Sequence, residues 1–518
     1  RRIRILESES MAKRVFIAEK PSVAQEFARI LKVNGRRGDG YLESEDTIVT
    51  WCVGHLVTMS YPEVYDAALK KWSLDTLPFL PEKFLYEVIP GVKKQFDTVS
   101  YLLNREDVDT IYICTDSGRE GEYIYRLVDQ MAQVSANKKK LRVWIDSQTE
   151  EEILRGIREA KPMAEYDNIS SSAYLRAKED YLMGINFSRV LSLKYGFWLN
   201  DTLKGQKWTS VSVGRVMTCV LGMVVKREMQ IRDFVKTPFY RVIGNFELQG
   251  KKFQGEWKAV EGSKYYQSPS LYKENGFKEK ENALALIDSL MQPEPVPSEI
   301  EQVAKKKEKK NPPLLFNLAE LQNTASKLFK ISPDETLAVV QELYEKKLVT
   351  YPRTDARVLS SAVAKEIGKN LNGLQGYPMT ASFLPYISQN QTYKGLEKTR
   401  YVNDKQITDH YAIIPTGQGL SAFSRLGELQ TKMYEVIVRR FLSIFYPPAV
   451  YQKLNVTVKA GEERFFTSTK VLLEEGFLPV TQYSFTKKKN PDEILSAEEK
   501  EEEKEESFDL KEVLNLLK

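Results

Sequence analysis

The first 150 residues alternate between short apolar runs and amphipathic stretches. Four β-branched or aromatic runs predict strands at residues 14–18, 48–53, 110–114 and 141–145. Helices are expected at residues 21–31, with Pro21 in the first turn, and at residues 121–131. Strands alternating with helices predict an open, mostly parallel α/β sheet, whose functional sites lie at the carboxyl ends of its strands.

The hydrophobic pattern changes twice after this region. From residue 149 to about 232 it is helical, most clearly over residues 170–193 and 212–228. From residue 234 to about 257 apolar and polar residues alternate, and the same texture returns at residues 451–480. We therefore expect an antiparallel β domain that is split by an insertion.

The insertion is preceded by a charged run and opens with helices. Residues 304–313 (AKKKEKKNPP) are typical of a solvated hinge, and we interpret the charge there as a linker, not a binding site. Residues 318–329 and 333–346 are helical and resemble a helix-turn-helix pattern that ends at Tyr351.

Length and composition then narrow the class of protein. A chain of 518 residues allows roughly three or four domains. Its 42% hydrophobic and 28% charged residues are globular values, which exclude wholesale disorder and a membrane bundle. The longest apolar segment, residues 211–225, contains Arg215 and is too short to span a bilayer. We expect a cytoplasmic protein.

The charge of the chain permits a polyanionic partner, and its few cysteines and histidines argue against a structural zinc site. The net charge of +5 includes an acidic run at residues 498–506, so the rest of the chain is more basic and permits a polyanionic partner. Cys52, Cys114 and Cys219 form no Cys-x-x-Cys pair, and the chain has only two histidines. A structural zinc site in this chain is therefore not expected.

Carboxylates follow two of the predicted strands. Residues 116–122 (DSGREGE) come after residues 110–114, and Glu19 and Lys20 come after residues 14–18. Carboxylate oxygens grouped at one sheet edge suit Mg²⁺, which keeps several waters and bridges to phosphate oxygens. The alternative is a solvated turn in which acidic residues favour a helix N-terminus. The residues alone leave both interpretations open.

A phenol and a guanidinium follow the helical pair, in residues 351–355 (YPRTD). Arg353 can bind a phosphate in a bidentate manner while Tyr351 attacks the phosphorus, which would store the phosphoester bond covalently. Against this, the chain has 27 tyrosines, and a phenol with an ordinary pKa near 10 is a poor nucleophile without nearby cations.

Seven segments together match a known family. In chain order they are AEKPS at 18–22, CVGHLV at 52–57, TDSGREGE at 115–122, RAKEDYLMGINFSR at 176–189, SVGRVMT at 212–218, YPRTD at 351–355 and TDHYAIIPT at 408–416. The chain resembles the type IA DNA topoisomerases and is most similar to their bacterial topoisomerase III branch. The resemblance spans residues 14 to about 480, and the order of the seven motifs makes it specific.

The resemblance implies a multidomain α/β plus α and β toroid with an N-terminal toprim domain. The expected boundaries are residues 11–155 for the toprim domain, 156–232 for the first half of a helical DNA-binding domain, 233–311 and 433–485 for a split β arch, 312–432 for a helical domain carrying the tyrosine, and 486–518 for an acidic tail. Tyr351 would face the acidic cluster across a domain interface.

The resemblance also implies an activity. Such enzymes cleave one DNA strand through a 5′-phosphotyrosyl link, pass a strand and religate, relaxing negative supercoils or decatenating DNA. No Gly-x-x-x-x-Gly-Lys-Ser/Thr loop is present, so ATP is not expected to be needed. The implied partners are single-stranded and negatively supercoiled or catenated DNA in the nucleoid, with a helicase partner left open.

By the same resemblance, each motif carries a role. Tyr351 would be the nucleophile, Arg353 the phosphate clamp and Lys20 the acid for the departing 3′-oxygen. Glu19 would assist there, and His410 would support the scissile strand. Mg²⁺ would be held by Asp116, Glu120 and Glu19, and the single-strand groove would be lined by Arg176, Asn186, Arg189 and Arg215.

For some of these residues, a purely structural role is the alternative interpretation. His410 alone could be a buried, hydrogen-bonded imidazole, and the arginines could be solvated helix faces. Two whole-protein alternatives also remain, namely a different toprim enzyme such as a nuclease or primase, and a catalytically impaired clamp on single-stranded DNA.

Two features depart from the family pattern. Gly118 stands where the family's Asp-x-Asp-x-Glu motif usually has its second aspartate, which predicts weaker Mg²⁺ binding. The chain stops soon after residues 508–518, before the segment that usually returns to the helical domain, so we expect a truncated or unusually short member. Residues 1–10 precede Met11 and are set aside.

Overall fold

The computed structural model describes residues 12–204, 208–291, 296–407, 410–486 and 516. The chain divides into two compact units, each built from three separate segments. The first contains residues 1–233, 317–356 and 405–425, and the second contains residues 234–316, 357–404 and 426–518. Most of the expected acidic tail, the acidic run at 498–506 and residues 1–10 lie outside the described residues.

A seven-stranded sheet organises the first unit, in the order β2-β3-β4-β1-β7-β8-β9. Its strands are β1 (Lys13–Ala18), β2 (Arg36–Gly38), β3 (Tyr41–Glu43), β4 (Thr47–Trp51), β7 (Val108–Cys114), β8 (Lys139–Arg142) and β9 (Lys161–Pro162). Strand β1 pairs in parallel with β4 and β7, and β7 pairs in parallel with β8. The expected parallel centre is confirmed, and the outer strands are antiparallel.

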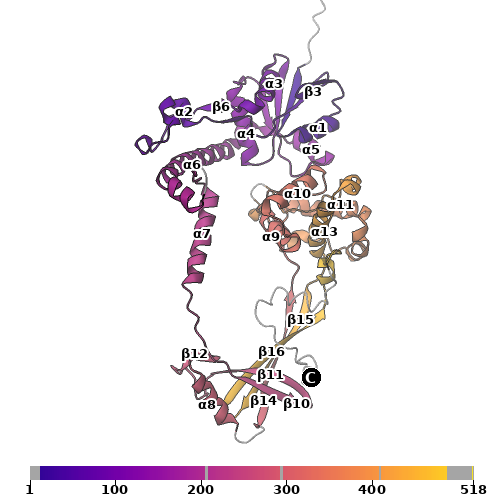
Figure 1. Ribbon diagram of the computed structural model, residues 1–518. Coiled ribbons are helices and arrows are strands. Elements are labelled where there is room, and N and C mark those ends of the chain that lie inside the picture. The colour runs from indigo at the N-terminus through magenta and orange to yellow at the C-terminus, as the bar shows by residue number, and fades with distance from the viewer. Residues whose placement is uncertain (1–11, 205–207, 292–295, 408–409, 487–515, 517–518) are drawn as a thin grey trace, which may run out of the picture. The chain divides into compact units, whose positions relative to one another are not determined.

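Side chains alternate between two cores across this sheet because successive strand residues point to opposite faces. Val15 and Ile17 pack in one core with α3 (Lys93–Asn104) and α4 (Arg119–Met131). Phe16 and Ala18 pack in the other with α1 (Pro21–Ile30) and α5 (Glu150–Arg158). The sheet is therefore covered on both faces, as in doubly wound folds (Figure 1).

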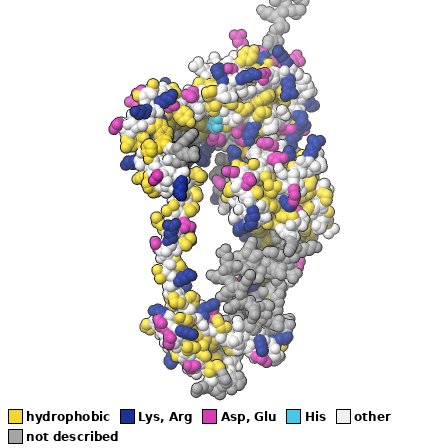
Figure 2. All heavy atoms as spheres, viewed as in Figure 1, with side chains coloured by type: hydrophobic (Ala, Val, Ile, Leu, Met, Phe, Trp, Pro, Cys, Tyr) yellow, Lys and Arg dark blue, Asp and Glu magenta, His cyan; other side chains and the backbone are white. Residues whose placement is uncertain are grey.

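Further helices complete the first unit. They are α2 (Pro62–Tyr65), α6 (Asp167–Thr202), α7 (Arg215–Arg232), α9 (Leu318–Phe329) and α10 (Pro333–Glu345), and a hairpin pairs β5 (Val57–Met59) with β6 (Tyr86–Val88). Helix α7 has no buried residue, and its apolar side chains, such as Met217 and Leu221, are exposed (Figure 2). No helix in the described ranges is long and apolar enough to cross a membrane.

The second unit contains a five-stranded antiparallel sheet in the order β10-β11-β16-β15-β14. Its strands are β10 (Ile243–Leu248), β11 (Lys251–Lys258), β14 (Ser298–Lys310), β15 (Ala449–Ala460) and β16 (Glu463–Glu474). A small hairpin pairs β12 (Leu271–Lys273) with β13 (Gly276–Phe277), and the helices are α8 (Lys280–Leu290), α11 (Ser361–Gly373), α12 (Leu384–Gln389) and α13 (Glu428–Ser443). The expected β region split by an insertion is confirmed, since β14 and β15 pair across 138 intervening residues.

The solvated hinge expected at residues 304–313 is wrong for most of its length. Residues 298–310 form β14, which pairs with β15 along its whole length at one edge of the sheet. An edge strand with one solvated face tolerates lysine and glutamate side chains, so a charge run that reads as a linker can still form a strand. Cross-strand pairing overrides the local composition here.

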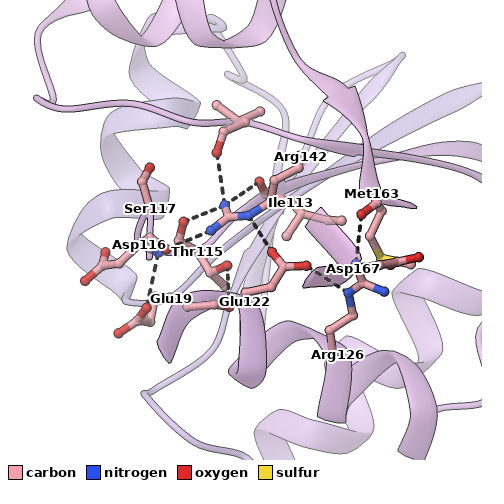
Figure 3. A network of polar contacts seen from close by, with 12 residues as sticks. Glu19, Ile113, Thr115, Asp116, Ser117, Glu122, Arg126, Arg142, Met163 and Asp167 are labelled. Carbon is pink, nitrogen blue, oxygen red and sulfur yellow. Dashed lines mark hydrogen bonds and ion pairs between the residues drawn. The ribbon is translucent and has the colours of Figure 1, made fainter. Parts of the chain in front are cut away.

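A buried ion pair fixes the segment that follows β7 (Figure 3). The side chains of Arg142 and Glu122 are fully buried, and Arg142 Nε donates to Glu122 Oε2 at 2.9 Å. The same guanidinium donates to the backbone carbonyl oxygens of Thr115 at 2.8 Å and Asp116 at 2.7 Å. Arg126 closes the network by donating to the other Glu122 oxygen at 2.8 Å.

Replacing Arg142 with methionine is expected to destabilise the first unit strongly. Removing one partner leaves the Glu122 carboxylate buried without its main counter-charge, which typically costs about 3–5 kcal/mol. Urea unfolding of the Arg142→Met protein should therefore show a clearly lower midpoint than wild type. The exposed Arg158→Met variant is the control, and equal midpoints for the two variants would contradict the assignment.

Candidate active site

Two carboxylates meet where β1 and β7 end side by side. Glu19 directly follows β1, and Asp116 lies two residues beyond β7. The backbone N–H of Asp116 donates to Glu19 Oε2 at 3.1 Å, and Figure 3 shows the two side chains next to each other. The parallel pairing of β1 with β7 therefore brings together residues that are 97 positions apart.

The environment of these carboxylates disfavours their charged forms. Burial raises the pKa of Glu19 well above its usual range, and the neighbouring Asp116 charge adds to this effect. Burial also raises the pKa of Asp116, against the nearby charges of Lys20 and Arg353. A divalent cation would offset the repulsion between the two carboxylates and favour their charged forms. Carboxylate oxygens are the hard donors that Mg²⁺ prefers. The donor set of Glu19 and Asp116 thus fits Mg²⁺.

The third predicted ligand, Glu120, points elsewhere. Its Oε1 lies 2.6 Å from His55 Nε2, and its side chain is largely exposed in the first turn of α4. The hydrogen bond from His55 lowers the pKa of Glu120, with further contributions from the charges of Arg176 and Arg353. In the described part of the chain, no group of three His, Cys, Asp or Glu side chains is arranged to hold a metal ion.

Tyr351 lies in the same site, brought there by the chain that follows α10. It is 7% exposed, and its backbone N–H donates to the Asp146 carbonyl oxygen at 2.9 Å. Burial raises the pKa of Tyr351 well above that of a free phenol, and Asp116 raises it further while Arg353 lowers it. The Asp116 and Glu19 carboxylates are close enough to this phenol to raise its pKa, so the tyrosine and the acidic pair belong to one site.

Arg353 and Lys20 supply the positive charge of the site. Arg353 is exposed, yet its charge acts on Glu19, Asp116, Glu120 and Tyr351. Lys20 stands at the N-cap of α1, with its Nζ 3.8 Å from Glu345 Oε1. The sequence-predicted residues Glu19, Lys20, Asp116, Tyr351 and Arg353 are thus brought together.

His410 is buried against Tyr351, with ring centroids 4.4 Å apart. Its Nδ1 lies 2.5 Å from Asp146 Oδ1, and its Nε2 contacts the carbonyl oxygen of Ser117. Both ring nitrogens therefore have an oxygen partner. His410 links the segment after β7 and Asp146 to the tyrosine.

Asp146 is the residue of this site that sequence reasoning missed. Its carboxylate contacts His410 and its carbonyl accepts from Tyr351, so one residue contacts both. It follows β8, the next parallel strand after β7, by four residues. A signal was available, because carboxylates after adjacent parallel strands share one sheet edge.

Two of the four expected groove residues line an open cavity. Arg176 on α6 and Arg215 at the start of α7 border a cavity of about 470 Å³, together with Arg119, Ser171, Ser172 and Glu179. Arg215 also pairs with Asp180 at 3.0 Å and with Glu179 at 3.5 Å. Three guanidiniums around one opening suit an anionic ligand such as a phosphate.

Asn186 and Arg189 are engaged in packing. The Asn186 amide bonds the backbone of Phe79, accepting from its N–H at 2.6 Å and donating to its carbonyl oxygen at 2.9 Å. Arg189 is buried, donates to the Leu69 carbonyl oxygen at 2.9 Å and stacks 5.3 Å from the Trp72 ring centroid. Both side chains hold the segment of residues 69–79 against α6.

The first unit matches the family described as Toprim domain over residues 14–147, and residues 164–514 match the family described as DNA topoisomerase. The chain is 37% identical over 472 residues to DNA topoisomerase 3 of Bacillus subtilis and 36% identical over 483 residues to that of Bacillus cereus. These alignments cover 91% and 92% of this chain. The chain spans 60% of the length of each relative.

A solved structure shares the fold. The full-length topoisomerase I of Thermotoga maritima superposes with a TM-score of 0.57 at 20% sequence identity. The superposition covers 92% of this chain and 69% of the Thermotoga chain.

Adding a carboxylate at position 118 is expected to tighten Mg²⁺ binding. Gly118 has an extended backbone (φ 169°), and a Cβ atom built there meets no heavy atom within 4 Å, so aspartate fits without strain. A further oxygen donor beside Asp116 should lower the Kd for Mg²⁺ several-fold in isothermal titration calorimetry. Gly91→Asp, also in open space, is the matched control. An unchanged Kd in Gly118→Asp would show that this position lies outside the metal site.

Proposed function

Because this chain belongs to the type IA DNA topoisomerases, of the bacterial topoisomerase III kind, we propose that it cleaves and religates one DNA strand through Tyr351 without ATP. One observation carries this proposal. A buried tyrosine from the segment after α10 lies against the carboxylates that follow β1 and β7 and against a histidine from a third segment. A toprim site with another activity would have no need of that tyrosine.

The groups of the site that can accept and donate protons support attack by the tyrosine oxygen on a phosphodiester. The raised pKa of Tyr351 means that its proton leaves during the attack, and the nearby Asp116 carboxylate, itself of raised pKa, can accept it. The new bond joins the tyrosine oxygen to phosphorus while the bond to the 3′-oxygen breaks. Lys20 supplies the proton that this oxygen takes up, and Glu19 assists beside it. Religation reverses these transfers.

Cationic side chains of the site can stabilise the negative charge on the phosphoryl group. Arg353 is the clamp on the phosphate oxygens, since its charge acts on Tyr351 and on both buried carboxylates. The His410 ring lies beside the tyrosine ring and positions the scissile strand. Glu19 and Asp116 would hold Mg²⁺, which would supply positive charge against the carboxylates and the phosphate, and Glu120 would join them only by leaving His55.

Single-stranded DNA is the proposed substrate at this site. The cavity bordered by Arg119, Arg176 and Arg215 supports a path for its phosphates, whereas the packing of Asn186 and Arg189 supports a framework role for those two. The physiological substrates we propose are negatively supercoiled or catenated DNA in the nucleoid. A helicase that exposes single strands would be a fitting partner.

Two other functions predict different chemistry at Tyr351. A toprim nuclease or primase would retain activity without the phenol. An impaired clamp would bind single strands with a salt-dependent affinity and never become covalently attached. The missing carboxylate at Gly118 is the feature that favours the clamp, and the burial of Tyr351 near enough to Asp116 and Glu19 for them to raise its pKa argues against it.

Tyr351→Phe is expected to abolish covalent capture of DNA. Wild-type protein incubated with a labelled single-stranded oligonucleotide and Mg²⁺, then denatured, should carry the 5′ side of the break on Tyr351. The Phe variant should bind the oligonucleotide normally and give no adduct, because it lacks the attacking oxygen. Tyr344→Phe, whose ring centroid lies 5.3 Å from that of Tyr351, is the matched control and should still form the adduct. An adduct in Tyr351→Phe would refute the assignment of the nucleophile.

Asp146→Asn is expected to slow cleavage by roughly 10²-fold while leaving oligonucleotide affinity unchanged. The substitution keeps the carbonyl that accepts from Tyr351 and removes the charge that pairs with His410. The chain has two histidines, so the ¹⁵N signals of a labelled His55→Gln protein report His410 alone and should shift from the imidazolium toward a neutral tautomer in the Asn variant. Asp109→Asn on the exposed side of β7 is the control, and an unshifted His410 signal in Asp146→Asn would sink the positioning role.

A further inference from the structure

The sheet of the second unit carries an unusual row of like charges. The register places Lys306 of β14 directly opposite Lys453 of β15, and Lys453 directly opposite Lys470 of β16. Directly opposed residues of antiparallel strands share one face, so the three ammonium groups project from the same side. Like charges in this arrangement destabilise a sheet, and the fold retains that cost.

This row stands on the face opposite the core that contains Trp257 and Leu454, and Lys470 Nζ lies 4.9 Å from the ring centroid of Tyr451, which is buried on the same face. Leu454, the next residue of β15, and Val456 are buried in that core, so alternation directs Lys453 to the other side. Lys306 is exposed, and Lys453 and Lys470 are half-buried. The lysine heads are therefore accessible to a ligand in solution.

One carboxylate within the row, Glu308, compensates part of the charge. It forms an ion pair with Lys470 at 3.0 Å, and the charges of Lys470, Lys453 and Lys306 all lower the pKa of Glu308. The carboxylate thus senses all three lysines, which places the four groups in one cluster. Three cations with one anion leave an excess of positive charge.

A second basic row lies on the same face. Six residues along β15, Lys459 is directly opposite Arg464 of β16, which is directly opposite Lys258 of β11. Glu301 pairs with Arg464 at 2.8 Å, and Glu299 lies opposite Lys459. At about 3.4 Å per residue the rows are roughly 20 Å apart, a span of several nucleotides.

The surface between the rows is suited to a single strand. It presents the small polar side chains of Asn455, Thr457 and Ser468, which can hydrogen-bond to phosphates. Phe466, opposite Thr457, lies on this face with Lys258 Nζ 5.7 Å from its ring centroid. Aromatic rings among cations are the elements that bind unpaired bases and their backbone.

We propose that this face of the β10-β11-β16-β15-β14 sheet binds the phosphate backbone of single-stranded DNA, through the row of Lys306, Lys453 and Lys470 and the row of Lys258, Arg464 and Lys459. The surface belongs to the second unit and uses no residue of the candidate active site. The choice of DNA as its ligand rests on the proposed function. The charge run of β14, which reads as a linker in the sequence, is then part of a binding surface.

The test measures affinity and its salt dependence in the full chain. In a Tyr351→Phe background, which prevents cleavage, the triple variant Lys306→Gln, Lys453→Gln and Lys470→Gln is titrated with a labelled single-stranded oligonucleotide at several salt concentrations. Because three phosphate contacts are lost, the magnitude of the negative slope of log K against log salt concentration should decrease by about 2. The matched control is Lys280→Gln, Lys365→Gln and Lys398→Gln, three exposed lysines of the same unit with the same change in net charge.

The outcomes separate this inference from the proposed function. The proposed surface would be refuted if the first triple variant kept the slope of the Tyr351→Phe parent. It would also be refuted if both triple variants lost the same amount of affinity and slope. A loss for duplex DNA with none for single strands would overturn the choice of single-stranded DNA. Covalent capture by the first triple with Tyr351 intact reports the proposed chemistry separately, and we expect it to persist on a short oligonucleotide.

Discussion

The buried guanidinium of Arg142 is the constraint on which the site depends. Glu122 neutralises its charge, and its other N–H groups donate to the carbonyl oxygens of the segment that follows β7. Because those carbonyls belong to Thr115 and Asp116, the pair that stabilises the interior also fixes the backbone that carries the Asp116 carboxylate. Fold stability and site geometry are therefore coupled through one ion pair.

With that segment fixed, the site gathers opposing charges at close range. Burial and the charge of Asp116 disfavour ionisation of Glu19, and the positive charges of Lys20 and Arg353 act on both carboxylates. An arrangement of this kind is poised to move protons and to accept a phosphate, because each added negative charge meets cations that are already positioned. The raised pKa of Tyr351 fits a nucleophile that is activated only during the reaction.

The sheet of the second unit uses charge differently. Its cations are exposed or half-buried and spread over several strands, so they suit a repeating polyanion better than one reacting phosphate. Under the two proposals, the first unit would supply chemistry at a single phosphate, and the second unit would offer a surface along the DNA backbone.

The sequence by itself determined the elements of the parallel sheet, the split β region and the motifs that identify the family, because periodicity and ordered motifs are local properties of the chain. It also selected Glu19, Asp116, Tyr351, Arg353 and His410. Only the tertiary structure decided that residues 298–310 form a strand, since pairing with β15 outweighs their composition. It likewise turned Glu120 toward His55, buried Arg189 and brought Asp146 to His410. Side-chain partners from distant segments depend on packing, and the spacing of residues along one chain does not specify them.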